Sequence, residues 1–591
     1  MEPTICSLPQ AFPICDDQIR IVDILPGSGS DPIALQCRVT NLQGDHVFEA
    51  LSYVWGDVHY KITVNISGYS INITEFLYAA FQQLRHPQNR RALWADQVCI
   101  NQDDERERSH QVGLMRAIYE RCSQCLIWLG TIPRDRQFFI QDAVVALDFL
   151  DTVARTRHGR HPFVADNEDG ERARKAFRAL VMGGNPWWSR VWTLQEASLP
   201  ISATLQWGPL AIPLETVELA AEAMCSHWSY GAISDRVAAE MSDLISNFLY
   251  PVRGLSIARR GESPLHTLMR WRYREATDPR DKVYGFIGLF NPDTLHRLPS
   301  LRDVSYTVSP ATLFRRVTVE LIQFDQDLRP LIGARELPHV TPGLPTWAID
   351  FASCSAIGRR QTMWWQHSHR YLRWTASKSL KHQFETARDD KSLRLCGVFI
   401  DNVQQISRVY HLGVEDDVND DKLRDFIFDF YRDLEQYQIS RCSDMNADYI
   451  GGGTLKDAFW RTMLGNLIMG EMPRGVPKDY DVSDFEDYVN DGRKNRLTLS
   501  LHGLLPNHAF FITAKGYIGI GPRDMRENDT IYVFYGGRVP FVIRAEDTPV
   551  REGRSTENCR YQLVSDAYVH GIMRGEGVMA TNEQPRIIEL V

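Results

Sequence analysis

The chain has 591 residues, of which 43% are hydrophobic and 24% are charged, and its formal net charge is −9. This length is too great for one hydrophobic core, so we expect roughly two to four globular domains. The acidic balance argues against a general nucleic-acid binder, because phosphate contacts need clustered lysine and arginine.

No segment predicts secretion or insertion into a membrane. Residues 1–15 lack a basic stretch followed by an apolar core, and no apolar run is long enough to cross a bilayer. The 11 cysteines are scattered, which favours reduced thiols, and the lone CxxC of Cys122 and Cys125 lacks the second pair that a structural zinc site needs. We therefore expect an intracellular, cytoplasmic protein and no metal site.

The amino-terminal segments predict strands and a short helix. Residues 21–25 and 33–39 look like paired strands, residues 61–73 like a β-hairpin and residues 74–84 like an amphipathic helix. Between them, residues 48–57 (FEALSYVWGD) predict an apolar strand that ends in an aromatic residue, a glycine and an acid. Strand tips in α/β sheets line ligand crevices, so this strand end is a candidate binding edge.

A strand, a helix and a second strand follow without interruption. Residues 93–100 (LWADQVCI) predict a buried strand with one carboxylate, Asp96, near its middle. Asn101 can cap the following helix, in which residues 105–108 stay mostly solvated. The apolar face of this helix consists of Val112, Met115, Ile118, Tyr119 and Cys122. Residues 125–129 then predict a second, parallel strand, joined to the first by a right-handed crossover.

Residues 185–198 (NPWWSRVWTLQEAS) combine three tryptophans with an acid. Helical spacing places Glu196 one turn from Trp192. Apolar surroundings raise the cost of ionising a carboxyl unless donors satisfy it, so Glu196 is either functional or tied to a partner such as Arg190. The sequence leaves both alternatives open.

Helices and then strands are expected in the remainder of the chain. Residues 142–153 predict a helix and residues 155–172 an exposed loop. Around Asp278, Arg280 and Asp281, a capped turn with a local salt bridge leads into a short helix.

Residues 416–437 predict another helix, and the acid-rich residues 478–496 predict a loop. Two hairpin signals follow, at residues 515–516 and 536–537. They predict a small barrel or sandwich.

These elements predict three regions. Residues 1–212 are expected to form an α/β domain with a mostly parallel sheet and helices on both faces. Residues 213–385 predict a mainly helical region, and residues 386–591 a mixed domain that is β-rich from about residue 497.

The motifs LSYVWGD, LWADQVCINQ, WLG and RVWTLQE, in this order and at this spacing, resemble the heterokaryon-incompatibility (HET) domain of filamentous fungi. Residues 275–284 (EATDPRDKVY) and 567–573 (AYVHGIM) also look like the longer proteins of that family. The resemblance implies non-self recognition and programmed cell death, a form of innate immunity, when unlike hyphae fuse. It implies a HET domain that acts as the death effector through a partner protein or through self-assembly.

The HET domain is in turn thought to be similar to the TIR domain, an open α/β fold with a parallel sheet, several of whose members cleave NAD. By that analogy residues 51–53 would match the first strand, and residues 192–196 resemble the TIR motif in which a tryptophan precedes the catalytic glutamate by four positions. Glu196 is then the candidate catalytic residue. The candidate substrate-binding residues are Ser52, Tyr53, Trp55, Asp57, Asp96, Arg190 and Trp192.

NAD would be the substrate of such an enzyme, and no cofactor is expected. Nicotinamide departs as a neutral leaving group from an oxocarbenium-like sugar, so one carboxylate could suffice. Trp55 or Trp192 could stack on a flat ring, while Asp57 and Asp96 could orient the ribose or the amide. The structural alternative is that the acids pair or cap locally and the tryptophans are core, so enzymatic activity stays open.

Overall fold

The computed structural model of the protein describes fourteen stretches of the chain. They are residues 8–29, 31–133, 139–156, 161–181, 185–227, 234–333, 339–353, 373–386, 391–412, 418–439, 444–468, 476–546, 559–581 and 583–591. The chain divides into a first unit, Met1–Ser263 with Arg274–Thr307, and a second unit, Pro264–Tyr273 with Val308–Val591. Within the described stretches, every helix is too short or too polar to span a bilayer.

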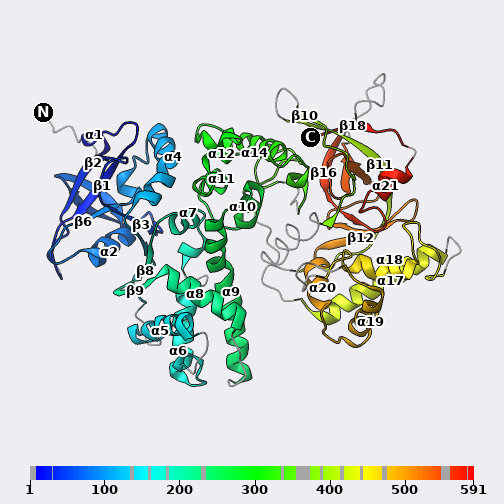
Figure 1. Ribbon diagram of the computed structural model, residues 1–591, viewed down its shortest axis with the longest axis horizontal. Helices are drawn as coiled ribbons and strands as arrows, with labels where there is room; N and C mark the ends of the chain where they lie inside the picture. Colours follow the sequence, from blue (N-terminus) through cyan, green and yellow to red (C-terminus); the bar gives the residue numbers. More distant parts are fainter. Residues whose placement is uncertain are drawn as a thin grey trace. The chain divides into compact units, whose positions relative to one another are not determined.

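A nine-stranded sheet forms the centre of the first unit (blue to cyan in Figure 1), in the order β5-β4-β2-β1-β6-β3-β7-β8-β9. Its strands are β1 (Gln18–Ile24), β2 (Leu35–Asn41), β3 (Glu49–Tyr53), β4 (Lys61–Ile66), β5 (Tyr69–Thr74), β6 (Arg91–Trp94), β7 (Cys125–Trp128), β8 (Ala203–Trp207) and β9 (Leu210–Pro213). Strands β6, β3, β7 and β8 are parallel, whereas β1–β2, β1–β6, β4–β5 and β8–β9 pair antiparallel. The predicted α/β class is confirmed, but the sheet is mixed, because antiparallel hairpins flank its parallel centre.

The helices of the first unit are α1 (Leu8–Ala11), α2 (Glu75–Leu84), α3 (Asp96–Cys99), α4 (Glu105–Arg121), α5 (Ile140–Thr156), α6 (Glu168–Val181), α7 (Thr193–Ser198), α8 (Leu214–His227), α9 (Asp235–Arg260), α11 (Asp281–Tyr284), α12 (Pro292–His296) and α13 (Pro299–Arg302). Trp94 of β6 contacts Tyr119 of α4, with ring centroids 5.7 Å apart, and Trp128 of β7 contacts Phe76 of α2 at 6.3 Å. Trp94 is in register with Ala50 and Trp128 with Tyr53, three residues further along β3. Because strand residues alternate between faces, α2 and α4 cover opposite faces of the sheet.

The chain after β6 differs from its prediction. Residues 93–100 do not form one strand: β6 ends at Trp94, and Asp96 opens the short helix α3, where its Oδ1 accepts a hydrogen bond from the Gln97 amide at 2.8 Å. An acid is favoured at a helix start, because the amide groups there have no partner within the helix.

The cap and the polar face of α4 are also corrected. Its N-cap residue is Asp104 rather than Asn101, since the Asp104 side chain accepts from the amides of the first turn. Glu107 is not mostly solvated, because its two oxygens accept from the guanidinium of the fully buried Arg20 at 2.5 and 3.0 Å. This ion pair ties α4 to β1.

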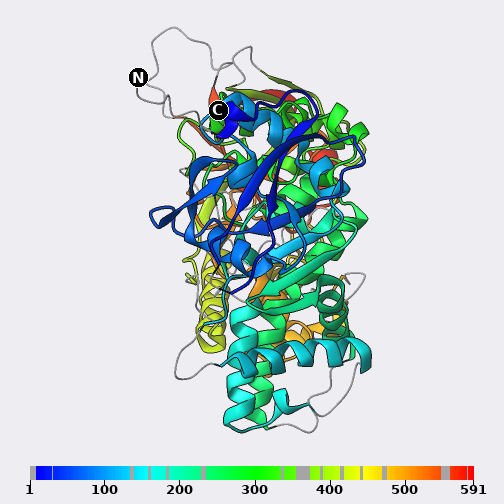
Figure 2. The ribbon, with the colours of Figure 1, turned by 90° about the vertical axis from the view of Figure 1, so that its left-hand side faces the viewer.

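Helices α5, α6, α8 and α9 pack together beside the sheet of the first unit (cyan to green in Figures 1 and 2). Phe149 of α5 stacks on Phe163 with ring centroids 3.9 Å apart, and Phe177 of α6 meets Phe248 of α9 edge-on at 5.1 Å. The predicted helix at 142–153 lies within α5 and is confirmed. The loop expected at 155–172 is only partly right, because α6 begins at Glu168; residues 157–160 lie outside the described stretches.

The second unit contains helices and a second sheet. Its helices are α10 (Pro264–Trp271), α14 (Pro310–Asp325), α17 (Asp420–Ile439), α18 (Leu455–Met463), α19 (Val482–Asp491), α20 (Thr498–Leu504) and α21 (Glu576–Ala580). Its strands are β10 (Phe384–Thr386), β11 (Leu393–Ile406), β12 (His508–Thr513), β13 (Ile518–Pro522), β14 (Thr530–Phe534), β15 (Phe541–Ala545), β16 (Arg560–Asp566), β17 (Tyr568–Val569) and β18 (Arg586–Leu590).

The long strand β11 closes a barrel. It pairs with β14 on one side and with β18 on the other, so the pairing runs β11-β14-β15-β16-β18 and back to β11. Both predicted hairpins are present, as β12–β13 and β14–β15, and the β-rich end of the chain is confirmed.

One helix prediction and one loop prediction in the second unit have different outcomes. The helix expected at 416–437 is α17, although residues 416 and 417 lie outside the described stretches. The loop expected at 478–496 is wrong, because α19 occupies most of it. Phe485, Tyr488 and Val489 of α19 are buried, and this i, i+3, i+4 pattern gives the helix one apolar face despite its acids.

Two motif glycines let α2 approach the parallel strands. Gly56 follows β3 and Gly130 follows β7, and their φ angles are positive, 73° and 94°. A Cβ on either residue would lie 3.0 Å from the Phe76 side chain of α2. Glycine is therefore favoured at both positions by the backbone conformation and by the space available.

Gly130→Ala should destabilise the first unit more than Gly68→Ala. Gly68 has a similar φ of 92°, but nothing lies within 4 Å of its would-be Cβ, so that control carries backbone strain alone. The clash with Phe76 should add about 1–3 kcal/mol to the loss in the Gly130 variant. Denaturant unfolding followed by tryptophan fluorescence measures both losses, and equal losses would contradict the steric argument.

Candidate functional site

The parallel strands of the first unit end at one edge of the sheet, and polar motif residues gather there. Ser52 and Tyr53 end β3, with Trp55 two residues further on; Asp96 follows β6, and Glu196 lies on α7. Ser52, Tyr53 and Glu196 are buried, whereas Trp55 and Asp96 are half-buried. The sequence motifs thus meet in space at the carboxyl edge of the parallel strands.

Glu196 accepts a hydrogen bond from a hydroxyl, which in turn accepts one from an indole. The Ser52 hydroxyl donates to Glu196 Oε2 at 2.5 Å, and Trp187 Nε1 donates to Ser52 Oγ at 2.8 Å. Glu196 is only 7% exposed, while Ser52 and Trp187 are fully buried. The carboxylate is therefore sealed beneath the surface, in a hydrogen-bonded arrangement that we call the Ser52–Glu196 pair.

Burial raises the pKa of Glu196 to about 7. The hydrogen bond from Ser52 and the positive charge of Arg190 act in the opposite direction, while the negative charge of Asp96 adds to the rise. Glu196 therefore exists in both protonation states near neutral pH, as a general acid or base requires.

Arg190 does not form the predicted alternative ion pair with Glu196 in the described part of the chain. Its guanidinium donates to the Tyr53 carbonyl oxygen at 3.3 Å, so it acts on Glu196 only through its charge. The hydrogen bond to the Glu196 carboxylate comes from Ser52 instead.

A second acid and indole lie next to this pair. Trp55 Nε1 donates to Asp96 Oδ2 at 2.8 Å. Burial, and then the neighbouring Asp96 carboxylate, hold the pKa of Tyr53 well above its usual value. Because Ser52 and Tyr53 are adjacent on β3, they point to opposite faces, so the sheet edge separates the Ser52–Glu196 pair from the Tyr53 ring.

Two predicted site residues point elsewhere. Asp57 is exposed, and its Oδ1 accepts from the His59 amide at 2.9 Å, which closes a turn. The predicted spacing of Trp192 and Glu196 is right for the backbone, since the Glu196 amide donates to the Trp192 carbonyl at 3.3 Å. The Trp192 indole nevertheless turns to Asp281, whose Oδ2 accepts from Nε1 at 3.1 Å.

Trp187 is the indole that sequence reasoning missed. Asn185 places it: the Asn185 side chain accepts from the Trp187 amide at 3.0 Å and donates to the Leu129 carbonyl at 2.8 Å. Asn followed by Pro signals a capped turn in the sequence. Trp187 and Trp188 are both buried, and Trp187 is the one that bonds to Ser52. The hydrogen bond from Asn185 to Leu129, the residue after β7, helps to place it, and the sequence does not show this bond.

A distant segment, residues 274–281, holds the turn that leads into α7, and we call it the clasp. The Arg274 guanidinium donates to the Arg190 carbonyl at 3.0 Å and to the Thr193 hydroxyl at 2.8 Å. The Val191 amide donates to the Glu275 carbonyl at 2.9 Å. Two motifs far apart in the sequence are thus bound to each other.

The local salt bridge predicted within the clasp is confirmed, and Asp281 makes further contacts outside it. Arg280 and Asp278 pair at 2.6 Å. Asp281, which sequence reasoning grouped with that local bridge, instead accepts from Trp192 and from the Tyr306 hydroxyl at 2.6 Å. Burial raises the pKa of Asp281 to about 6.

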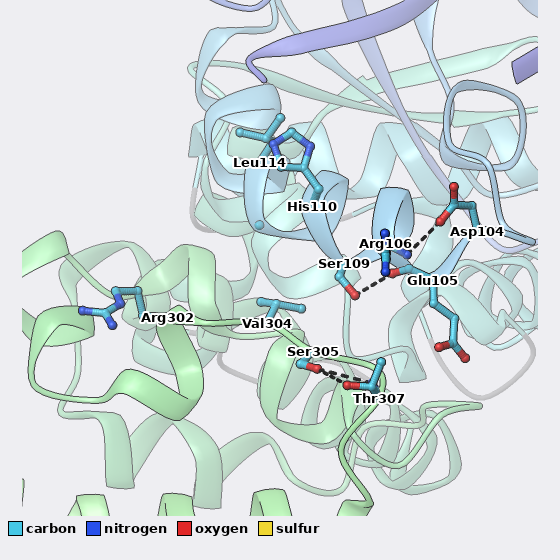
Figure 3. A pocket seen from close by; sticks show the side chains of 11 residues that line it. Asp104, Glu105, Arg106, Ser109, His110, Leu114, Arg302, Val304, Ser305 and Thr307 are labelled. Atoms are coloured by element: carbon cyan, nitrogen blue, oxygen red, sulfur yellow. Dashed lines mark hydrogen bonds between the residues drawn. The ribbon is translucent and has the colours of Figure 1, made fainter. Parts of the chain in front are cut away.

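A groove of about 760 Å³ lies between α4 and the chain after α13 (Figure 3). Its lining residues are Asp104, Glu105, Arg106, Ser109, His110, Gly113, Leu114, Arg302, Val304, Ser305 and Thr307. Tyr306, which holds Asp281, lies in the chain between two of them. The groove therefore borders the network that ends at α7.

Comparison with known proteins places these motifs in a family. Residues 48–196 match the family described as Heterokaryon incompatibility protein (HET), and residues 488–587 match the Het-6 beta-barrel domain. Residues 48–196 are thus similar to the HET domain. The chain is 24% identical over 662 aligned residues to Heterokaryon incompatibility protein 6, OR allele, of Neurospora crassa, and the alignment covers 94% of each chain. No solved structure matches it.

The matched region contains the Ser52–Glu196 pair but not the clasp. The HET match ends at Glu196, whereas residues 274–281 of the same unit hold the turn that carries this residue. A segment beyond the matched stretch therefore contributes contacts to the turn that carries Glu196.

Glu196→Gln should flatten the dependence of stability on pH. Glu196 releases its proton near pH 4.5 when the chain is unfolded and near pH 7 when it is folded, so stability falls as pH rises through this window and the contribution is lost above it. Glutamine cannot ionise, so the variant should avoid a loss on the order of 3 kcal/mol between pH 4.5 and pH 8.

Unfolding free energies at these two pH values measure the effect. Glu105→Gln, which changes an exposed glutamate, is the matched control and should keep the wild-type profile. A Glu196→Gln profile that parallels the wild type would contradict the burial of an acid with a raised pKa.

Proposed function

We propose that this protein acts in non-self recognition between fungal hyphae, with its HET domain as the effector that triggers cell death. The match of residues 48–196 to the HET family supports the role in non-self recognition. The relative from Neurospora, which aligns over 94% of each chain, carries heterokaryon incompatibility in its name. In this proposal a partner protein, or a second copy of the HET domain, switches the effector on by assembly in the cytoplasm.

The sealed state of Glu196 is the observation that carries the proposal. An acid that is 7% exposed, and whose carboxylate accepts from the buried Ser52 hydroxyl, offers nothing to a ligand until the site opens. Such a closed site suits an effector that stays silent in the separate protein. Assembly would supply the free energy that shifts the population towards the open state.

A second candidate function is NAD cleavage by a TIR-like HET domain. It is favoured by one observation: a carboxylate with a pKa of about 7 lies at the carboxyl edge of parallel strands, where α/β folds bind ligands. In this reaction the glycosidic C–N bond breaks, nicotinamide leaves with the electron pair, and water adds to the ribose. Ionised Glu196 would stabilise the cationic sugar and accept the proton of that water.

Forced assembly of the full chain tests the proposal. We expect a fungal host that expresses the protein fused to an inducible dimerisation module to lose viability on addition of the inducer. A host that survives while the protein is abundant and dimerised would refute the assembly mechanism.

Released nicotinamide, measured in the same cells, separates the two candidate functions. Glu196→Gln should leave killing intact if assembly alone suffices. If NAD cleavage kills, the variant should lower nicotinamide release at least about 100-fold and abolish killing. Asp57→Asn, which changes an exposed acid of the same motif region that lies outside the Ser52–Glu196 pair, is the matched control.

A further inference from the structure

Helix α7 cannot hold its own geometry. It has six residues, and helices this short are unstable alone, because the cost of nucleation is not recovered. The position of Glu196 therefore depends on contacts that α7 and its entering turn make with the rest of the first unit.

Asp281 makes a charged contact with that turn. Its Oδ2 accepts from Trp192 Nε1 at 3.1 Å, and Trp192 is the residue that caps α7. The Trp192 carbonyl in turn accepts from the Glu196 amide at 3.3 Å. A single helical turn thus separates the indole held by Asp281 from the carboxylate held by Ser52.

Asp281 is itself fixed from the other side. Its Oδ1 accepts from the Tyr306 hydroxyl at 2.6 Å, so both oxygens are used. The Tyr306 ring lies beside two guanidinium groups, with Arg108 at 4.2 Å and Arg280 at 5.1 Å from its centroid, and Arg280 is paired with Asp278 at 2.6 Å. An acceptor supported in this way can hold an indole in one orientation.

We propose that Asp281 is a positioning residue for Glu196: by holding Trp192 it fixes the turn into α7 and so brings the Glu196 carboxylate to the Ser52 hydroxyl. Asp281 does not touch Glu196 and acts through the helix. The inference rests on the second candidate function only in that Glu196 is taken there as the acid of the reaction. Displacement of Tyr306 would then disturb the Ser52–Glu196 pair from a distance.

Hydrogen exchange of the full chain tests this positioning role. Asp281→Ala should speed exchange in peptides covering 190–199 at least about tenfold, the ratio expected when a charge-assisted hydrogen bond is lost, while the strands β3 and β7 keep their protection. Asp281→Asn keeps acceptor capacity and should fall between the wild type and Asp281→Ala. Trp192→Phe removes the donor alone and should reproduce the effect if Asp281→Ala does not fold.

Asp303→Asn is the matched control, because Asp303 is an exposed acid that pairs with Arg302 in the same part of the chain. It should leave exchange in the 190–199 peptides unchanged. Faster exchange throughout the first unit of the Asp281 variants would overturn the proposal, because it would indicate a general structural role.

The titration of Glu196 supplies a readout that a general loss of stability would not move. The infrared carboxyl band that is missing in Glu196→Gln belongs to Glu196. The pH midpoint of this band should fall from about 7 towards 4.5 in Asp281→Asn, because α7 no longer keeps the carboxyl group buried. An unchanged midpoint would overturn the proposal. Neither readout depends on killing or on nicotinamide, so a failure of the proposed function remains distinguishable.

Discussion

The hydrogen bond between Ser52 and Glu196 is the interaction on which the first unit is organised. It joins Ser52, on the central parallel strand β3, to Glu196 on helix α7. Strands β4 to β7 and helices α2 to α6 lie between these two elements in the sequence. A carboxyl in an apolar interior is costly unless it is protonated or satisfied by donors, and here both compensations operate, since Ser52 donates and the pKa lies near 7. Any substitution that admits water to Glu196 lowers the pKa of its carboxyl group, and so changes the charge of the site as well as its packing.

The clasp explains how so small a helix can carry that acid. Arg274 and Glu275 bind the backbone of the turn into α7, and Asp281 binds its tryptophan. These contacts involve peptide groups and one charged acceptor, which are directional in a way that apolar packing is not. The site is thus built from two sequence motifs, one inside the stretch matched by the HET family and one beyond it.

Sequence reasoning succeeded where periodicity and strand ends carried the information. The amino-terminal hairpins, helix α5 and the β-rich end follow from alternation and turn residues. The meeting of Ser52, Asp96 and Glu196 follows from the rule that parallel strands present their carboxyl ends at one edge. That rule needs only the order of the elements.

The failures have physical causes. Trp192 was favoured over Trp187 because helical spacing was applied across the start of a helix, where the side chain is free to turn away. Asp281 was assigned to the local salt bridge, because the sequence does not show that Asp278 alone pairs with Arg280 while Asp281 accepts from Trp192 and Tyr306. The many acids of residues 478–496 led to the prediction of a loop, where the structure has α19. The helical spacing of Phe485, Tyr488 and Val489 was nevertheless visible in the sequence.

The clasp contacts the turn into α7 although it lies far along the chain. The stretch between Ser198 and Arg274 therefore begins at the end of α7 and ends at a residue that is bound to the start of α7. Strands β8 and β9 and helices α8 and α9 lie within this stretch, and Arg259 of α9 donates to the Ala197 carbonyl of α7 at 3.1 Å. The surroundings of Glu196 are therefore complete only when the chain has returned from this stretch to residue 274.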